Sequence, residues 1–349
     1  MRRGLLWGAA GVAAAIAARS ATRPRAADMR GDVVLITGGS RGLGLAMARE
    51  FARLGCRIAI CARSVEELEA ARASLIDLGA EVAAIPCDIT NNDQVLELVR
   101  RVRTRFGRID TLVNNAGIIR VAPIENMTLR DFEEAMAVMF WGVVYPTLAV
   151  LPEMRERGRG RIAAITSIGG KVSVPHLLPY CCAKFAAVAF CEGLRAEMAQ
   201  HGVKVTTIAP GLMRTGSYRK AEFKGKQHHE AAWFSLAATL PFVSMGAERA
   251  ARQVVRAIRL GESEKILTTQ ATLMARFNGA FPGLVPDMLG AVNRFLPGTT
   301  ADRESILTGA EAEASQGGLF RAFTTLGRRA ARRLNEESRP MSTASSQRI

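Results

Sequence analysis

The sequence predicts an α/β protein built on a doubly wound parallel β-sheet. Short apolar runs alternate with longer amphipathic stretches between Asp32 and Lys265. A glycine-rich turn at residues 37–44 stands directly between the first apolar run and the first amphipathic stretch. Strands that alternate with helices in this way form βαβ units, in which successive strands lie parallel.

The elements can be followed along the chain. Residues 33–37 (VVLIT) predict a buried strand, and a helix follows the glycine turn. Residues 56–62 predict the second strand, before a stretch with helical spacing of its apolar residues. Four further strands are expected in EVAAIPCD, TLVNNAG, RIAAITS and VKVTTIAP. Continuous apolar strands are typical of a sheet that helices cover on both faces.

The turn reads TGGSRGLG, and it supplies our first candidate cofactor-binding residues: Gly38, Ser40, Arg41, Gly42, Leu43 and Gly44. Glycines permit a tight turn and a close approach of the backbone to a pyrophosphate, whose charge then lies at a helix amino terminus. A simple turn is the alternative, but the placement between a strand and a helix favours a nucleotide site.

Six motifs in order resemble the short-chain dehydrogenase/reductase family over residues 28–265. They are TGGSRGLG, CDIT at residues 87–90, NNAG at 114–117, Ser167, Tyr180 with Lys184, and PGLMRT at 210–215. The resemblance implies a single Rossmann-type domain with about seven parallel strands that assembles as a homodimer or homotetramer. It also implies further cofactor contacts, from Asp88 and Ile89 at the adenine, from Asn115 and Ala116 along the sheet, and from Pro210, Gly211 and Thr215 near the nicotinamide.

The residues after the second strand favour NADP(H) over NAD(H). A carboxylate at this position would bond the ribose 2′-hydroxyl and repel a 2′-phosphate. The sequence has no carboxylate at residues 61–64, and Arg63 and Arg41 are suited to bind a phosphate. The alternative is that both arginines point into solvent.

Tyr180, Lys184 and Ser167 are the candidate catalytic residues. Tyr180 and Lys184 stand four residues apart in a helical run, so they share one helix face. We expect the lysine ammonium to lower the pKa of the phenol, which then acts as general acid or base. The resemblance implies that Lys184 also holds the nicotinamide ribose. Ser167 would bond the substrate oxygen.

Some residues depart from the pattern or carry less weight. Many members of the family place an asparagine where this chain has Met139, so a proton relay through that side chain is not expected here. His176 precedes Tyr180 and is interpreted as an ordinary loop residue rather than part of the substrate entrance. His228 and His229 lie in a region that forms a substrate lid in the family. We expect no metal site.

The chain divides into four predicted parts: an apolar anchor with a basic linker (1–27), the catalytic domain (28–265), an apolar and helical extension (266–335) and a disordered tail (336–349). Residues 4–18 are uncharged and more arginines follow than precede them, which favours an uncleaved membrane anchor with the catalytic domain in the cytoplasm. A helix lying on the membrane, a cleaved leader, a disordered leader and a cytoplasmic protein are the alternatives. Pro282, Pro286 and Pro297 are expected to divide the extension into short helices.

The composition narrows the function. The net charge is +15, but no basic stretch is interleaved with aromatic residues, so nucleic acid is not an expected partner. Apolar residues before Tyr180 favour an apolar substrate. The predicted function is transfer of a hydride between NADP(H) and a carbonyl or alcohol carbon. A catalytically weak, cofactor-binding scaffold or regulatory protein at a membrane is the alternative.

Overall fold

The computed structural model describes residues 25–240, 243–315 and 324–336. Its centre is a seven-stranded sheet in the order β11-β7-β6-β4-β1-β2-β3, in which every neighbouring pair is parallel. The strands are β1 (Val33–Thr37), β2 (Arg57–Ala62), β3 (Val82–Pro86), β4 (Thr111–Asn114), β6 (Gly160–Ile165), β7 (Val203–Pro210) and β11 (Glu264–Leu267). The predicted α/β, doubly wound class is confirmed.

The seventh strand was not recognised from its sequence. Strand β11 crosses the expected boundary between the catalytic domain and the extension, which was placed after Lys265. It is only four residues long, and its first two residues are charged. The sheet therefore extends two residues into the predicted extension, where Leu267 pairs with Pro210 of β7.

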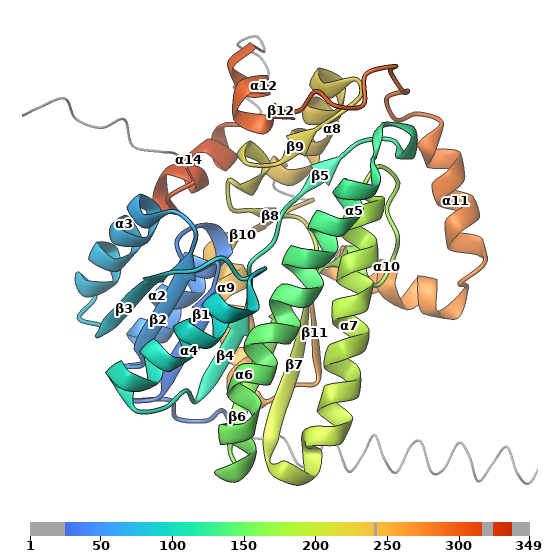
Figure 1. Ribbon diagram of the computed structural model, residues 1–349. Helices are drawn as coiled ribbons and strands as arrows, with labels where there is room; N and C mark the ends of the chain where they lie inside the picture. The colour runs from blue at the N-terminus through green and yellow to red at the C-terminus, as the bar shows by residue number, and fades with distance from the viewer. Residues whose placement is uncertain (1–24, 241–242, 316–323, 337–349) are drawn as a thin grey trace, which may run out of the picture.

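Helices cover both faces of the sheet (Figure 1). Helices α2 (Gly42–Arg53), α3 (Val65–Ile76) and α9 (Ala247–Leu260) share one apolar core with the sheet, and α4 (Asn92–Phe106), α6 (Gly142–Glu156) and α7 (Leu178–Met198) share the other. Strand β1 contributes Val34 and Ile36 to the first core and Val33 and Leu35 to the second, because successive side chains of a strand point to opposite faces.

The order of the strands reverses between β1 and β4. The chain proceeds from β1 to β2 and β3 on one side, then returns to β4 on the other. A crevice forms outside the carboxyl ends of parallel strands at such a point, and ligands of α/β proteins bind there. The glycine turn follows β1 and the NNAG segment follows β4, so both motifs lie at this crevice.

A smaller layer lies beyond the carboxyl ends of the strands. It contains the sheet β12-β9-β5 and the pair β10-β8. These strands are β5 (Arg120–Val121), β8 (Met213–Arg214), β9 (Glu222–Phe223), β10 (Met245–Gly246) and β12 (Leu307–Thr308). Helices α8 (Gln227–Thr239), α12 (Gly309–Ser315) and α14 (Thr325–Arg333) pack around them. Tyr218, Phe223 and Phe234 centre a separate apolar cluster here.

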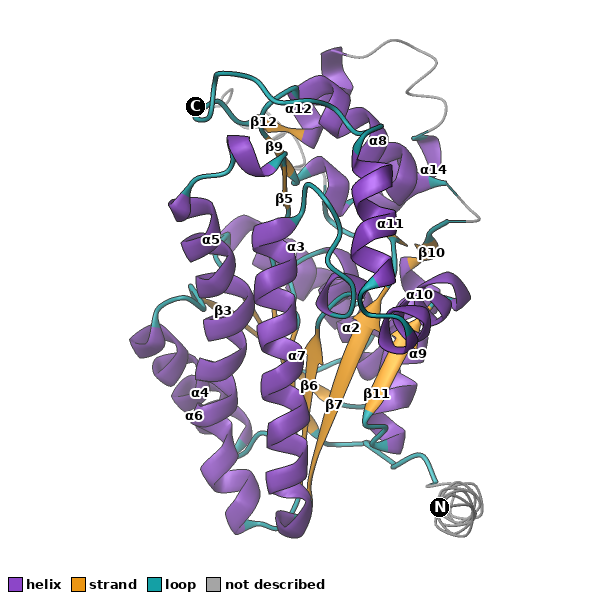
Figure 2. Cartoon of the chain, turned by 90° about the vertical axis from the view of Figure 1, so that its right-hand side faces the viewer, coloured by secondary structure: helices purple, strands orange, loops and turns teal. Residues whose placement is uncertain are grey.

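Helices α10 (Thr269–Ala280) and α11 (Leu284–Asn293) form an arm at the right edge of Figure 1, and this edge faces the viewer in Figure 2. Pro282 separates the two helices and Pro297 follows the second, as expected. Pro286 does not break α11, because it lies in the first turn, where a missing N–H costs no helical hydrogen bond. The arm exposes a row of large apolar side chains: Leu273, Phe277, Phe281, Leu284, Met288, Val292 and Phe295.

One helical stretch in the described part of the chain, Leu129–Glu156, is long and apolar enough to span a membrane. It comprises α5 (Leu129–Met136), the π-helical turn η2 (Ala137–Trp141) and α6. Half of its most apolar window is buried, and α6 packs on α4, β4 and β6, so it is a core helix of the domain. The expected anchor at residues 4–18 lies outside the described residues.

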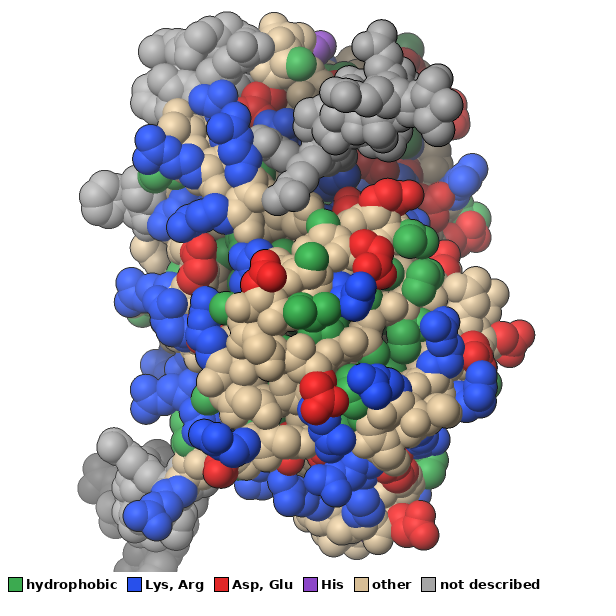
Figure 3. All heavy atoms as spheres, turned by 90° about the vertical axis from the view of Figure 1, so that its left-hand side faces the viewer, with side chains coloured by type: hydrophobic (Ala, Val, Ile, Leu, Met, Phe, Trp, Pro, Cys, Tyr) green, Lys and Arg blue, Asp and Glu red, His purple; other side chains and the backbone are tan. Residues whose placement is uncertain are grey.

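On the face of the molecule shown in Figure 3, basic side chains are interspersed with acidic ones.

Candidate active site

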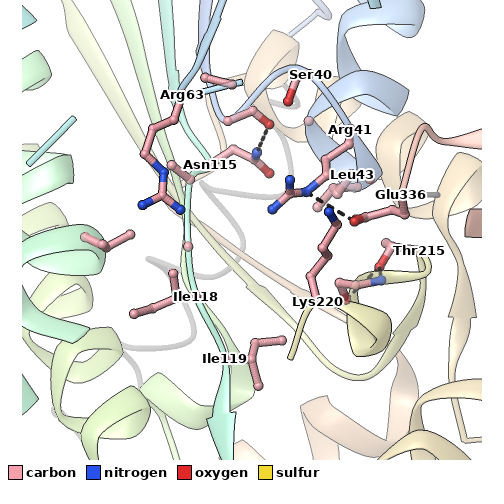
Figure 4. A pocket seen from close by; sticks show the side chains of 18 of the residues that line it. Ser40, Arg41, Leu43, Arg63, Asn115, Ile118, Ile119, Thr215, Lys220 and Glu336 are labelled. Carbon is pink, nitrogen blue, oxygen red and sulfur yellow. Dashed lines mark hydrogen bonds and ion pairs between the residues drawn. The ribbon is translucent and has the colours of Figure 1, made fainter. Parts of the chain in front are cut away.

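A cavity of about 950 Å³ opens at the crevice between β1 and β4. Figure 4 shows part of its lining. Most of the predicted cofactor residues line it, together with both residues of the Tyr–Lys motif: Gly38, Ser40, Arg41, Gly42, Leu43, Gly44, Arg63, Asp88, Ile89, Asn115, Ala116, Thr215, Tyr180 and Lys184. Motifs separated by more than 140 positions in the sequence therefore surround one cavity.

The glycine turn leaves no room for side chains. Gly42 has a φ of +56°, which favours glycine, and it begins α2. A Cβ on Gly44 would lie 2.1 Å from the carbonyl oxygen of Gly38 and 2.6 Å from Nδ2 of Asn115. The backbone of the turn thus packs directly on the NNAG segment, and Gly42, Leu43 and Gly44 at the start of α2 line the cavity. This cradle fits the pyrophosphate of a dinucleotide.

Asn115 and Ala116 hold the turn in place. The amide of Asn115 donates to the carbonyls of Thr37 (3.1 Å) and Gly38 (2.9 Å). The backbone N–H groups of Asn115 and Ala116 donate to the Thr37 hydroxyl at 3.0 and 3.3 Å. The role of Asn115 in this structure is to join the ends of β1 and β4 at the cavity.

Two of the predicted catalytic residues, Tyr180 and Lys184, line the cavity, whereas Ser167 is not among its lining residues. Tyr180 and Lys184 lie in the first two turns of α7, and the Lys184 Nζ is 5.7 Å from the centre of the Tyr180 ring. Nζ donates to the carbonyl of Ile165 at the end of β6 (2.9 Å). Ser167, which follows β6, hydrogen-bonds to the Tyr180 side chain. The helix and the strand end therefore bring the three side chains together.

Burial opposes the expected effect of Lys184 on the phenol. Loss of water contact raises the pKa of Tyr180 to about 12, although the hydrogen bond to Ser167 lowers it. The same cause lowers the pKa of Lys184 to about 8. The expectation that the pKa of the phenol is lowered is therefore wrong, because desolvation disfavours the charged forms of both side chains. Tyr180 is protonated at neutral pH, and Lys184 remains largely charged.

The two arginines predicted to bind a 2′-phosphate differ in their contacts. Arg63 is exposed at the edge of the cavity, and Figure 4 shows its side chain directed into it. Arg41 instead forms ion pairs with Glu67 of α3 at 2.7 Å and with Glu336 at 3.2 Å. The Ser40 hydroxyl also donates to Glu67 (3.2 Å). Of the two arginines, Arg63 is thus the one with its guanidinium available.

The remaining predicted contacts are placed as follows. Asp88 accepts hydrogen bonds from the backbone and the hydroxyl of Thr90. Thr215 is buried beside the turn, and its hydroxyl donates to Ser217 at 2.8 Å. Pro210 and Gly211 are not among the residues that line the cavity. Pro210 is the last residue of β7, and the N–H of Gly211 donates to the carbonyl of Leu267. Both residues precede Thr215 in the chain and fix where the segment to it begins.

Met139 lies buried in the π-helical turn η2, close to Lys184. A Cβ on Gly117 would be 3.7 Å from both the Lys184 Nζ and the Met139 Sδ. The thioether and the ammonium thus both lie next to Gly117. The hydrogen bond that Lys184 Nζ makes among the described residues goes to Ile165 instead.

His176 does not line the cavity. It is buried, and its Nδ1 lies 2.8 Å from Oε1 of Glu230 in α8, whose other oxygen accepts from Trp233. The residue therefore joins the loop before Tyr180 to the outer layer. No group of three His, Cys, Asp or Glu suited to a metal ion occurs among the described residues.

Sequence reasoning missed Glu336. It was assigned to the disordered tail, but its side chain is buried and lines the cavity next to Arg41. Its local sequence, LNEESRP, is polar and gives no indication of burial. The contact depends on the path of the preceding helix α14, which no motif specifies.

The chain matches the family model for short chain dehydrogenase over residues 32–224. This chain belongs to the short-chain dehydrogenase/reductase family. It is 40% identical over 192 residues to a dehydrogenase/reductase SDR family protein 7-like from Anopheles gambiae, which covers 54% of this chain and 61% of that one. The match thus spans about three-fifths of that relative.

Solved structures agree with the family assignment. A short-chain dehydrogenase from Streptomyces avermitilis superposes with a TM-score of 0.65 at 28% identity and covers 76% of this chain and 99% of its own. An actinorhodin polyketide ketoreductase variant with NADPH gives a TM-score of 0.62 at 28% identity and covers 69% of this chain and 97% of its own. The family model ends at residue 224, so the arm and the carboxyl-terminal residues lie beyond it.

Proposed function

We propose that this protein transfers a hydride between NADP(H) and the carbonyl or alcohol carbon of an apolar substrate. The observation that carries the proposal is the single cavity that joins the glycine turn to Tyr180 and Lys184. The bound cofactor supplies or accepts the hydride. Tyr180 donates the proton to the substrate oxygen or accepts it, the Lys184 ammonium supports this transfer, and Ser167 orients the substrate oxygen.

The protonation states favour reduction of a carbonyl. Burial raises the pKa of Tyr180 to about 12, so the phenol carries a proton to donate at neutral pH. Lys184 is charged over most of the neutral range, since burial leaves its pKa at about 8. Its ammonium stabilises the negative charge that develops on the phenol oxygen when the phenol gives up its proton. Ser167 lies close enough to the phenol to lower its pKa, so both side chains can act on one substrate oxygen.

Preference for NADP(H) is supported by Arg63. Its guanidinium is directed into the cavity, and residues 61–64 contain no carboxylate. Glu67, which lines the cavity, is neutralised by Arg41 and lies near Lys220. We expect Arg63→Asp to weaken NADPH binding by about tenfold or more and to leave NADH binding nearly unchanged, because only NADPH carries the 2′-phosphate. Equal losses for the two cofactors would contradict the assignment.

An apolar substrate is supported by the cavity wall near Tyr180. Ile118, Ile119 and Val138 line this end. We also propose that residues 4–18 hold the protein at a membrane with its catalytic domain in the cytoplasm, and that it forms a homodimer or homotetramer. A membrane position would give the cavity access to substrates of low solubility in water.

The experiment is a panel of apolar ketones and alcohols, assayed with NADPH, NADH and their oxidised forms. We expect NADPH-dependent reduction of at least one ketone. Tyr180→Phe is expected to lower kcat by about 100-fold or more with little change in cofactor Kd, since it removes the proton donor only. A protein that binds NADPH tightly but turns over no member of the panel would favour the scaffold alternative.

A further inference from the structure

The segment Thr324–Glu336, here called the strap, runs from the outer layer to the glycine turn. It consists of Thr324, helix α14 and the three residues that follow the helix. The strap packs closely along its path: a Cβ on Gly216 would lie 2.6 Å from Ala331, and one on Gly327 would lie 2.6 Å from Thr239. Near its end, Arg49 of α2 donates to the carbonyl of Arg333 at 2.9 Å.

The last three residues of the strap bind the turn itself. The carbonyl of Leu334 accepts from the N–H of Gly42 at 2.8 Å. The Asn335 amide donates to the carbonyls of Ser40 (3.1 Å) and Glu67 (3.0 Å). Asn335 has a φ of +58°, which asparagine tolerates better than most residues. These contacts attach the strap to the first turn of α2 at a defined position.

Glu336 directs a carboxylate into the cavity. Its Oε2 lies 3.2 Å from Nε of Arg41, and a Cβ on Gly42 would lie 2.6 Å from its Oε1. Figure 4 shows it beside Arg41 and Lys220. The side chain is only 4% exposed, and Oε2 receives no hydrogen bond from the described residues. The Leu334 carbonyl oxygen thus binds a helix N–H, and the Glu336 carboxylate binds an arginine. A phosphate would make the same two kinds of contact at the start of a helix.

We propose that Leu334–Glu336 occupies the phosphate subsite of the cofactor and that the dinucleotide must displace it to bind. This inference rests on the proposed cofactor. The Leu334 carbonyl and a pyrophosphate oxygen need the same N–H of Gly42, and Glu336 would repel any phosphate near Arg41. Only molecules with a released strap can bind the cofactor. The strap therefore lowers the apparent affinity for the cofactor in proportion to the fraction of molecules in which it is released.

The test compares the full-length protein with Asn335→Ala, which loses both amide hydrogen bonds to the turn. Because both bonds hold the strap on the turn, we expect the NADPH Kd to fall by about tenfold or more. Asn278→Ala is the matched control, because Asn278 also donates its amide to a backbone carbonyl, that of Lys171, but far from the turn. Its Kd should equal that of the wild type. Titration calorimetry measures all three.

Hydrogen exchange gives an independent readout in the wild-type protein. Added NADPH should increase exchange at residues 331–336 and decrease it at residues 42–45. Reduced exchange at residues 331–336 would overturn the proposal, because the strap would then close over the cofactor. An NADPH Kd for Asn335→Ala equal to or weaker than that of the wild type would overturn it too. If neither protein binds NADPH or NADH, the proposed cofactor fails together with this inference; measurable binding with equal Kd values removes this inference alone.

Discussion

At the scale of single residues, the burial of the charged Lys184 side chain lowers the stability of the folded protein. The folded protein holds this lysine at a pKa of about 8, below its ordinary value of 10.5. The unfolded chain therefore binds more protons at this position between these two values. Stability must rise with pH in this window, and below about pH 8 the protein carries the full penalty of a buried charge.

Lys184→Met should show this penalty directly. The variant removes the titrating group, so we expect its free energy of unfolding to lack the part of the rise between about pH 8 and 10.5 that Lys184 causes in the wild type. Its kcat should fall by about 100-fold or more, because the proton transfer loses its ammonium. Urea unfolding across this range measures the first effect. Parallel pH profiles of the two proteins would contradict the assigned burial.

Individual residues differed in how far the sequence predicted them. Tyr180, Lys184 and Ser167 were predicted from the resemblance to the family, and the four-residue spacing added that the tyrosine and the lysine share one helix face. The direction of the Tyr180 pKa shift was wrong, because it depends on water exclusion by residues from α5, η2 and the loop after β4 that no local pattern specifies. Arg41 was placed correctly at the cavity, but its pairing with Glu67 and Glu336 was not predicted.

At the scale of elements, the glycine turn was predictable because its geometry is local. Gly44 tests this claim. A Cβ there would lie 2.1 Å from the Gly38 carbonyl oxygen, so we expect Gly44→Ala to cost about 1–3 kcal/mol of stability and to weaken NADPH binding. Gly193→Ala in α7 is the control, because no atom lies within 4 Å of its added Cβ and helical alanine is favoured over glycine. Comparable losses in the two variants would contradict close packing of the turn.

The strap was not predictable, because its docking joins the end of the chain to α2 and α3. Burial is the main cause that raises the pKa of Glu336 to about 7 from 4.5; Glu67 adds to the shift, and Arg41 and Lys220 oppose it. The docked strap thus binds a proton more readily than the released strap. Docking should weaken as pH rises from about 4.5 through 7.

The pH dependence of cofactor binding checks this sign. NADPH affinity of the wild type should increase as pH rises through about 7, because the strap loosens. Glu336→Gln should lose that part of the pH dependence and bind NADPH more weakly than the wild type above pH 7, since a neutral side chain stays docked. Calorimetric titrations of both proteins at several pH values would contradict this account if the two profiles coincide.

At the scale of the whole molecule, the sequence predicted the sheet but not the outer layer. Repeated apolar strands and amphipathic helices determine the doubly wound part, whereas the outer layer uses two-residue strands whose pairing is set by the tertiary structure. The arm was expected to be apolar and broken by prolines. Its exposed row of side chains, from Leu273 to Phe295, became visible only in the structure.

Membrane attachment belongs to this scale. We expect the full-length protein to bind lipid vesicles and a protein without residues 1–25 to bind at least about tenfold more weakly while it retains NADPH binding, because about 15 apolar residues leave the bilayer. Phe281→Ser in the shortened protein measures what the arm contributes. Flotation of vesicles separates the bound fraction. Equal binding by the full-length and shortened proteins would refute an anchor at residues 4–18.

The central claim is that the Tyr180 phenol serves a hydride transfer from NADPH in the cavity above the glycine turn. Its most direct test uses NADPH deuterated at its transferable position, an apolar ketone from the panel, and mass spectrometry of the alcohol. The wild type should place deuterium on the alcohol carbon. Tyr180→Phe should bind NADPH equally well but form product at least about 100-fold more slowly. An alcohol without deuterium, or equal rates from the two proteins, would contradict the account.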